Sequence, residues 1–175
     1  KEPNHSAALF IKASAVANSG WKVLNDRNGI IEEFLKNPNQ NINDTIEKIL
    51  YKVQLDFEIF NDAAVEVKKF GSRPEEIAIY HVSTRNIYIE AKKRSNGSFV
   101  PDIAKKYHQL LKIGGKLSAV SFEPIYRDTI LENGKSYLSV LSGYSPSSSY
   151  YGRPQYLAAV PSIAENLVIK KYMYS

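Results

Sequence analysis

The spacing of hydrophobic residues changes near residue 60, from the helical period of three to four to the strand period of two. Before that point, apolar residues recur at helical spacing from about 4 to 18, over 29–36 and from 44 onward. After it, apolar and polar positions alternate over 63–68, 77–81 and 87–91, which predicts strands. Helices at both ends of the chain, around a block of strands, indicate an α+β fold.

Glycine-containing turns divide the strand block into hairpins. Gly114-Gly115 separates strands predicted over 107–113 and 116–122, and a two-residue hairpin turn of this kind needs positive φ. Asn133-Gly134 predicts another turn, before a last strand over 137–141. The strands are therefore expected to be mostly antiparallel and to belong to one domain over residues 1–175.

Polar residues near the helix ends give further expectations. Ser6 suits the cap of the first helix, and Gly20 suits its end. The sequence 44–47 has the spacing of a capping box, with Asp44 as the cap and Glu47 reaching back to it. A short strand is predicted over 21–24. The helical residues predicted to face the core are Leu9, Ala13, Val16, Ala17, Ile30, Ile31, Phe34, Leu35, Ile46, Ile49, Leu50 and Val53.

A turn followed by a helix is predicted at the end of the chain. In the turn that begins at Tyr151, Gly152 would give backbone freedom, and Pro154 suits the first helical position. Apolar residues then recur at helical spacing over 156–172. Pro161 removes one helical hydrogen bond, so the helix is expected to kink near it or to restart there.

The composition is that of an ordinary globular protein, with 43% hydrophobic and 23% charged residues. No cysteine is present, which excludes a disulfide framework and thiolate chemistry. No apolar run approaches the roughly 20 residues that span a membrane. Of the twelve tyrosines, Tyr88, Tyr107, Tyr126 and Tyr137 lie in predicted strands, where they are expected to pack in the sheet rather than to stack on bases.

The net charge of +5 is concentrated between Lys92 and Lys116. That window holds seven basic residues and one acid, Asp102, so it carries +6. It is either a solvated loop with a polar strand face, or a patch that contacts nucleic acid or an acidic protein. Contact with DNA would be independent of sequence, because no base-reading helix is present in the window. The candidate contact residues are Lys92, Lys93, Arg94, Lys105, Lys106, Lys112 and Lys116.

Residues for catalysis or metal binding are not grouped along the chain. His5, His81 and His108 stand alone and match no metal-ligand spacing. The serines of 145–149 do not form the Gly-x-Ser-x-Gly turn of serine hydrolases. We therefore expect no cofactor, no metal and no catalytic residue, and we expect that the protein is not an enzyme.

Five short motifs follow one another in an order that resembles the portal proteins of tailed bacteriophages. A small polar run leads into the first helix, and a later helix leads into a strand for which the family pattern is Gly-Asn-Ala-Tyr-x-Glu. A histidine-containing strand with Thr-Arg, an aromatic-x-Gln strand and a Tyr-Tyr-Gly-x-Pro turn follow. The matching stretches are 4–8, 56–67, 79–85, 106–109 and 150–154. One departure is Phe60, which replaces the usual glycine before Asn61, so the tight turn there must be built differently.

The resemblance implies that residues 1–175 are the N-terminal wing region of a longer chain, whose last helix leads towards a stem. It implies a structural subunit of a ring of about twelve copies at one capsid vertex of the virion. That ring is assembled in the host cytoplasm and passes double-stranded DNA, without sequence specificity, during packaging and ejection. Its expected partners are other copies, the terminase motor, capsid or scaffold proteins and neck proteins, and not a membrane.

Two alternatives remain open from the sequence. One is a small basic nucleic-acid-binding module in which the 92–116 window clamps phosphates. The other is an unrelated enzyme domain that lacks its catalytic half.

Overall fold

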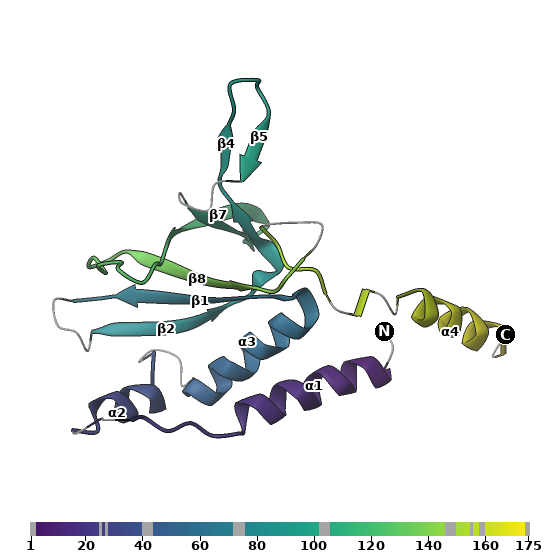
Figure 1. Cartoon of the computed structure of the whole chain (residues 1–175), viewed down its shortest axis with the longest axis horizontal. Coiled ribbons are helices and arrows are strands. Elements are labelled where there is room, and N and C mark those ends of the chain that lie inside the picture. The colour runs from purple at the N-terminus through teal and green to yellow at the C-terminus, as the bar shows by residue number, and fades with distance from the viewer. Residues whose placement is uncertain are drawn as a thin grey trace.

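The computed structural model describes residues 3–24, 26, 28–39, 44–71, 76–101, 106–145, 150–154, 156–157 and 160–173, and it has the expected α+β fold (Figure 1). The helices in these ranges are α1 (Pro3–Ala17), α2 (Ile30–Lys36), α3 (Ile46–Phe60), the short 3-10 helix η1 (Thr84–Asn86) and α4 (Val160–Met173). The strands are β1 (Asp62–Lys69), β2 (Ile77–Val82), β3 (Ile87–Ile89), β4 (Ala91–Lys93), β5 (Phe99–Pro101), β6 (Tyr107–Ile113), β7 (Lys116–Pro124) and β8 (Ser136–Ser142).

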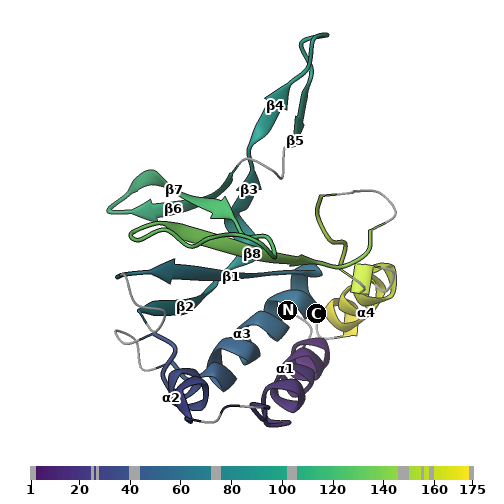
Figure 2. The ribbon, with the colours of Figure 1, turned by 60° about the vertical axis from the view of Figure 1, so that its left-hand side comes forward.

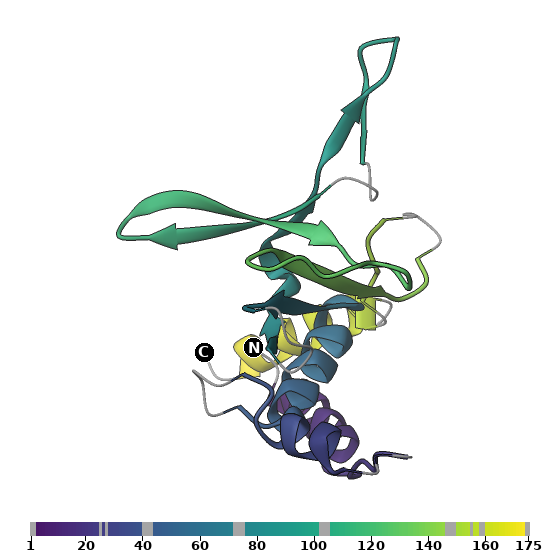
Figure 3. The same cartoon turned by 90° about the vertical axis from the view of Figure 1, so that its left-hand side faces the viewer.

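Six of these strands form one sheet in the order β2-β1-β8-β7-β6-β3, and β4 and β5 form a separate two-stranded ribbon. All neighbouring pairs are antiparallel except β7 and β8, which are parallel and pair only through Glu123–Tyr137 and Pro124–Leu138. The prediction of mostly antiparallel strands is therefore confirmed. Because β7 meets β8 so briefly, the β6–β7 hairpin diverges from the rest of the sheet (Figure 3).

The helices lie on one side of the sheet. Helix α3 lies against β1 and β2, and α1 packs on the far side of α3, so the body has three layers (Figures 1 and 2). A core cluster of Ala64, Val82, Phe122 and Leu138 lies on the face of the sheet away from α3, because Val82 alternates with His81, whose side chain contacts Asp56 of α3. Small residues on α1, Ala13 among them, allow that helix to approach α3 closely.

The Gly114-Gly115 hairpin forms as predicted. Tyr107 pairs with Phe122 and Ile113 pairs with Lys116, and the two glycines have φ of 56° and 82°. Because both central residues have positive φ, the turn is of the primed kind that suits the twist of two paired strands.

Several local predictions are wrong. Residues 21–24 form no strand. The predicted strand 87–91 is divided at Glu90, because β3 pairs with β6 whereas β4 turns away to pair with β5. Val16, Ile30, Ile31 and Leu50 were expected to face the core, but they are at least 37% exposed. The cause is that α1 buries only its small residues against α3, and that α2 lies at the edge of the body (Figure 2).

The cap of α3 also differs from the prediction. Thr45 is the N-cap residue and makes no side-chain capping bond to the helix, whereas Asp44 instead accepts a hydrogen bond from Lys52 at 2.8 Å. Glu47 does not reach back to residue 44. It accepts a hydrogen bond from the indole N–H of Trp21. The Glu47 carboxylate accepts hydrogen bonds from the Thr45 hydroxyl, from the backbone N–H of Glu47 and from Trp21. These bonds hold the pKa of Glu47 below its usual range.

This contact predicts an acid-sensitive signal from Trp21, the only tryptophan of the chain. The pKa of Glu47 is lower in the folded than in the unfolded chain, so its charged form stabilises the fold. This stabilisation is complete at pH values above the pKa of Glu47 in the unfolded chain. It is lost as the pH falls through the pKa of Glu47 in the folded chain. We expect the fluorescence of Trp21 to change with a midpoint below about pH 4.3, the value of an unperturbed glutamate. Glu47→Gln should abolish that change, and its persistence in the variant would contradict the assignment.

Candidate functional site

A polar junction forms where α3 ends and β1 begins. Asn61 ends the helix in the left-handed conformation, with φ of 57°, and its N–H donates to the carbonyl of Phe57 at 2.8 Å. Asparagine tolerates this conformation better than most residues. The missing glycine at Phe60 is therefore compensated one residue later, by Asn61 itself.

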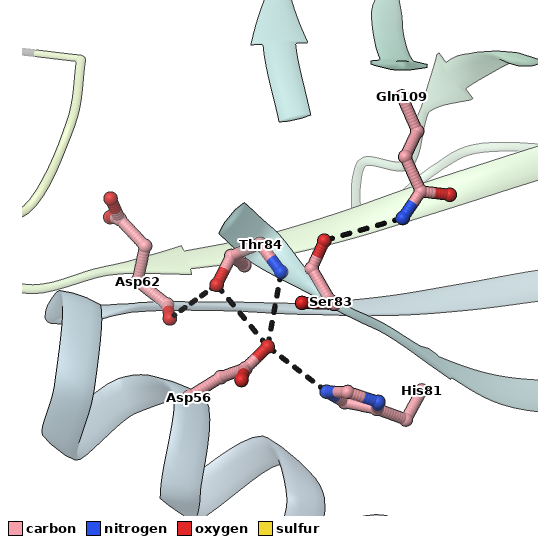
Figure 4. Close-up of polar contacts among 6 residues, drawn as sticks. All are labelled: Asp56, Asp62, His81, Ser83, Thr84 and Gln109. Carbon is pink, nitrogen blue, oxygen red and sulfur yellow. Dashed lines mark hydrogen bonds and ion pairs between the residues drawn. The ribbon is translucent and has the colours of Figure 1, made fainter. Parts of the chain in front are cut away.

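Asp56 is the buried acid of this junction. It lies in the last turns of α3, and one carboxylate oxygen, Oδ2, accepts a hydrogen bond from the Thr84 backbone N–H at 3.0 Å (Figure 4). The same oxygen lies 3.0 Å from Nε2 of His81 and 3.3 Å from the Thr84 hydroxyl. His81 and Asp56 form an ion pair when the imidazole is protonated. Asp56 thus connects α3 to the end of β2 and to η1.

Thr84 and Gln109 extend the same network. The Thr84 hydroxyl lies 3.2 Å from the carbonyl oxygen of Asp62, so its single proton serves either this carbonyl or Asp56. Gln109, on β6, donates from Nε2 to the carbonyl of Ser83 at 3.3 Å (Figure 4). The network therefore reaches from α3 across the sheet to β6.

Gly152 brings the end of the chain to this junction. Its N–H donates to both carboxylate oxygens of Asp62, at 2.8 and 2.9 Å. A Cβ at Gly152 would lie 2.0 Å from the carbonyl oxygen of Asn61, a distance that no side chain could occupy. The prediction that Gly152 supplies backbone freedom is wrong, since its φ is not positive. The glycine is needed for close approach.

The neighbours of Gly152 also differ in part from the prediction. Pro154 is not the first residue of the helix, because α4 begins at Val160. The N–H of Leu157 donates to the Pro154 carbonyl at 3.2 Å and closes a single turn instead. Pro161 lies in the first turn of α4, where its missing N–H costs nothing. The sequence predicted that the helix would either kink near Pro161 or restart there. Because α4 starts at Val160, the structure agrees with a restart.

Tyr151 connects the turn at 150–154 to β3. Its hydroxyl accepts a hydrogen bond from the N–H of Ile89 at 3.2 Å. Burial and the nearby Tyr126 and Tyr151 raise the pKa of Tyr107 above its usual range. A cavity lined by Asp62, Thr84, Tyr107 and Tyr151, among others, has a volume of about 20 Å³, which suits one water molecule. Among the described residues, the junction therefore binds chain segments together, and this cavity is too small for a substrate.

Four of the five stretches singled out in the sequence, 56–67, 79–85, 106–109 and 150–154, meet at this junction. Asp56, Asp62 and Thr84 join these stretches, and none of the three was predicted from the sequence to do so. A signal for Asp56 was available, because it follows Ile49 and Val53 at helical spacing and so places a carboxylate on the predicted buried face of α3. Such an acid needs buried donors.

Five of the seven basic residues lie on two hairpins. Lys92, Lys93 and Arg94 lie on the β4–β5 ribbon, whereas Lys112 and Lys116 lie at the tip of the β6–β7 hairpin. The two hairpins point in different directions (Figure 3). Lys106 pairs with Glu123 at 3.3 Å. Lys105 lies outside the described residues.

A smaller polar group, made by His108, Ser121 and Glu90, lies outside this network. His108 lies 3.0 Å from the Ser121 hydroxyl and 3.7 Å from Glu90, on an open strand face. No three His, Cys, Asp or Glu side chains among the described residues are placed to hold a metal ion. No described helix is long and apolar enough to cross a membrane.

No protein-family model matches the chain, and no curated protein matches its sequence.

Proposed function

We propose that this chain is the wing region of a portal subunit, a structural component of a ring that passes DNA at a capsid vertex. The observation that carries the proposal is the meeting of four motif segments at the α3–β1 junction. Motif residues that are far apart in sequence, such as Asp62 and Gly152, are in direct contact. Motifs shared only by chance along a chain have no reason to meet at one point in the fold.

The position of α4 also supports this proposal. The chain leaves the junction at 150–154, and α4 extends from the body beside it (Figure 1). Val160, Val168 and Ile169 of α4 are between 42% and 66% exposed. Exposed apolar residues on a projecting helix suit contacts between subunits. In this proposal α4 leads into the stem, and the body described here serves as scaffold.

The nucleic-acid alternative, a single clamp made by the whole 92–116 window, receives less support. Five of its basic residues lie on two diverging hairpins, and Lys106 is paired with Glu123. The junction offers no substrate cavity, which weighs against the enzyme alternative within the described residues.

The proposal predicts a closed ring for the intact protein and a monomer, or a weak association, for residues 1–175 alone. The reason is that most of the stem contacts would lie beyond α4. Light scattering at tens of micromolar, in salt that permits assembly, measures both masses. The 175-residue chain is the matched control. An intact protein that stays monomeric under these conditions would rule out the portal assignment.

A further inference from the structure

The β4–β5 ribbon projects from the body as an isolated arm (Figures 1 and 3). Lys92 pairs with Val100 and Lys93 pairs with Phe99, and the N–H of Arg94 donates to the Ser98 carbonyl at 2.8 Å. Gly97, with φ of 83°, closes the tip. Every residue from 91 to 99 is exposed. Nothing in the packing of the body explains the ribbon, because it adds no side chain to the core.

The ribbon carries positive charge only. Residues 91–101 include Lys92, Lys93 and Arg94 and no acid. None of these three side chains pairs with an acid among the described residues. Three adjacent cations repel one another, so the arrangement is unfavourable until an anion neutralises it.

The three cations lie on both faces of the ribbon. Side chains alternate along a strand, so Lys93 shares one face with Phe99, and Lys92 shares the other with Val100. Arg94 continues this alternation and falls on the face of Lys92. A flat anionic surface, such as a lipid bilayer, would contact only one of these faces. A binding site with negative charge on two opposite walls would contact both.

We propose that the β4–β5 ribbon enters a groove of duplex nucleic acid and contacts the phosphates on its two sides. The major groove of DNA is about 12 Å wide and about 8.5 Å deep, and it admits a two-stranded ribbon. Each side of the ribbon has three strand residues and one more that is paired through the Arg94–Ser98 hydrogen bond, and four residues at about 3.3 Å each give an arm of roughly 13 Å. Such an arm is long enough to reach the groove floor. The contacts are electrostatic and independent of sequence, because lysine and arginine bind phosphates without reading bases.

This inference deepens the proposed function, since it names the element that would touch DNA in a portal ring. It does not depend on the ring, because one chain carries a complete ribbon. If the 175-residue chain did not bind DNA but the intact protein still formed a ring, only the ribbon assignment would be wrong. If the ribbon bound DNA but the intact protein were monomeric, only the portal assignment would be wrong.

The test measures the affinity of the 175-residue chain for a labelled 20-base-pair duplex by fluorescence anisotropy over a series of salt concentrations. With three phosphates neutralised, the slope of log K against log salt should be about −2.7. One variant, Lys93→Ala, removes the charge from one face. A second, Lys92→Ala with Arg94→Ala, removes it from the other. The double variant Lys112→Ala with Lys116→Ala, at the tip of the other hairpin, is the matched control.

Both ribbon variants should bind more weakly, by roughly tenfold for each lost contact near 50 mM salt, with the slope reduced by about 0.9 per contact. The control should bind as the parent does. An effect from only one face of the ribbon, or an equal effect from the control, would overturn the proposal. The absence of any binding at low salt would also overturn the proposal. Displacement of the duplex by poly-glutamate at equal charge would overturn it as well, because it would indicate an acidic protein partner. Circular dichroism should show the parent's melting temperature for all variants.

Discussion

Gly152→Ala is expected to destabilise the protein by about 3 kcal/mol, at the upper end of the cost of overpacking. The added Cβ would lie 2.0 Å from the carbonyl oxygen of Asn61, so the turn or the end of α3 must move. That movement also separates the Gly152 N–H from the Asp62 carboxylate. Gly152→Val, with two more methyl groups, should cost more still. Urea denaturation of the parent and the variants measures these differences.

Gly134→Asn is the matched control for Gly152. Gly134 also lies in a turn, but its φ is 78° and a Cβ there would meet no atom within 4 Å. Asparagine tolerates this backbone conformation, so the control should stay within about 0.5 kcal/mol of the parent. If Gly152→Ala were as stable as the control, the close approach of 150–154 to the junction would be wrong.

The periodic parts of the fold were predictable because each reflects a local property of the chain. The alternation over 63–68 predicted β1, and Gly114-Gly115 predicted the β6–β7 hairpin at the right residues. Local sequence fixes such features, since turn chemistry and side-chain period act between neighbours.

The parts that failed depend on contacts between distant segments. Val16 has the spacing of a buried residue, but it is half exposed, whereas the small residues Ala13 and Ala17 of α1 are buried. Gly152 was recognised as necessary, but the reason, a clash with Asn61, arises 91 residues away. Asp56 is paired only because β2 and η1 bring His81 and Thr84 to it. None of these partners can be identified from spacing along the chain.

The junction has a mechanical role in the proposed subunit. Asn61 accepts a hydrogen bond from Gly143, directly after β8, and Asp62 accepts one from Gly152. The segment that leads to α4 is thus anchored to the end of α3. A force on α4 would be transmitted to the three-layered body through these hydrogen bonds. Stability measurements at the junction therefore test the part of the fold on which the proposed scaffold role depends.

Asp56→Ala is expected to destabilise the protein by about 3 kcal/mol, because hydrogen bonds to a charged group contribute more than neutral ones and their loss leaves buried donors unpaired. Asp56 is 9% exposed, and Thr84 and His81 both face its Oδ2. Without the carboxylate, the Thr84 N–H has no acceptor in the junction, and the Thr84 hydroxyl keeps only the Asp62 carbonyl. Thermal and urea denaturation should both show the loss.

Two further variants make this result specific. Asp128→Ala removes an exposed carboxylate and should stay within about 0.5 kcal/mol of the parent. Asp56→Asn keeps an oxygen that can accept from Thr84 but loses the charge that attracts His81, so its stability should fall between those of the parent and Asp56→Ala. This variant remains informative if Asp56→Ala does not fold. Equal stability of Asp56→Asn and the parent would mean that the charge of Asp56 contributes nothing. The junction would then depend on hydrogen bonds alone.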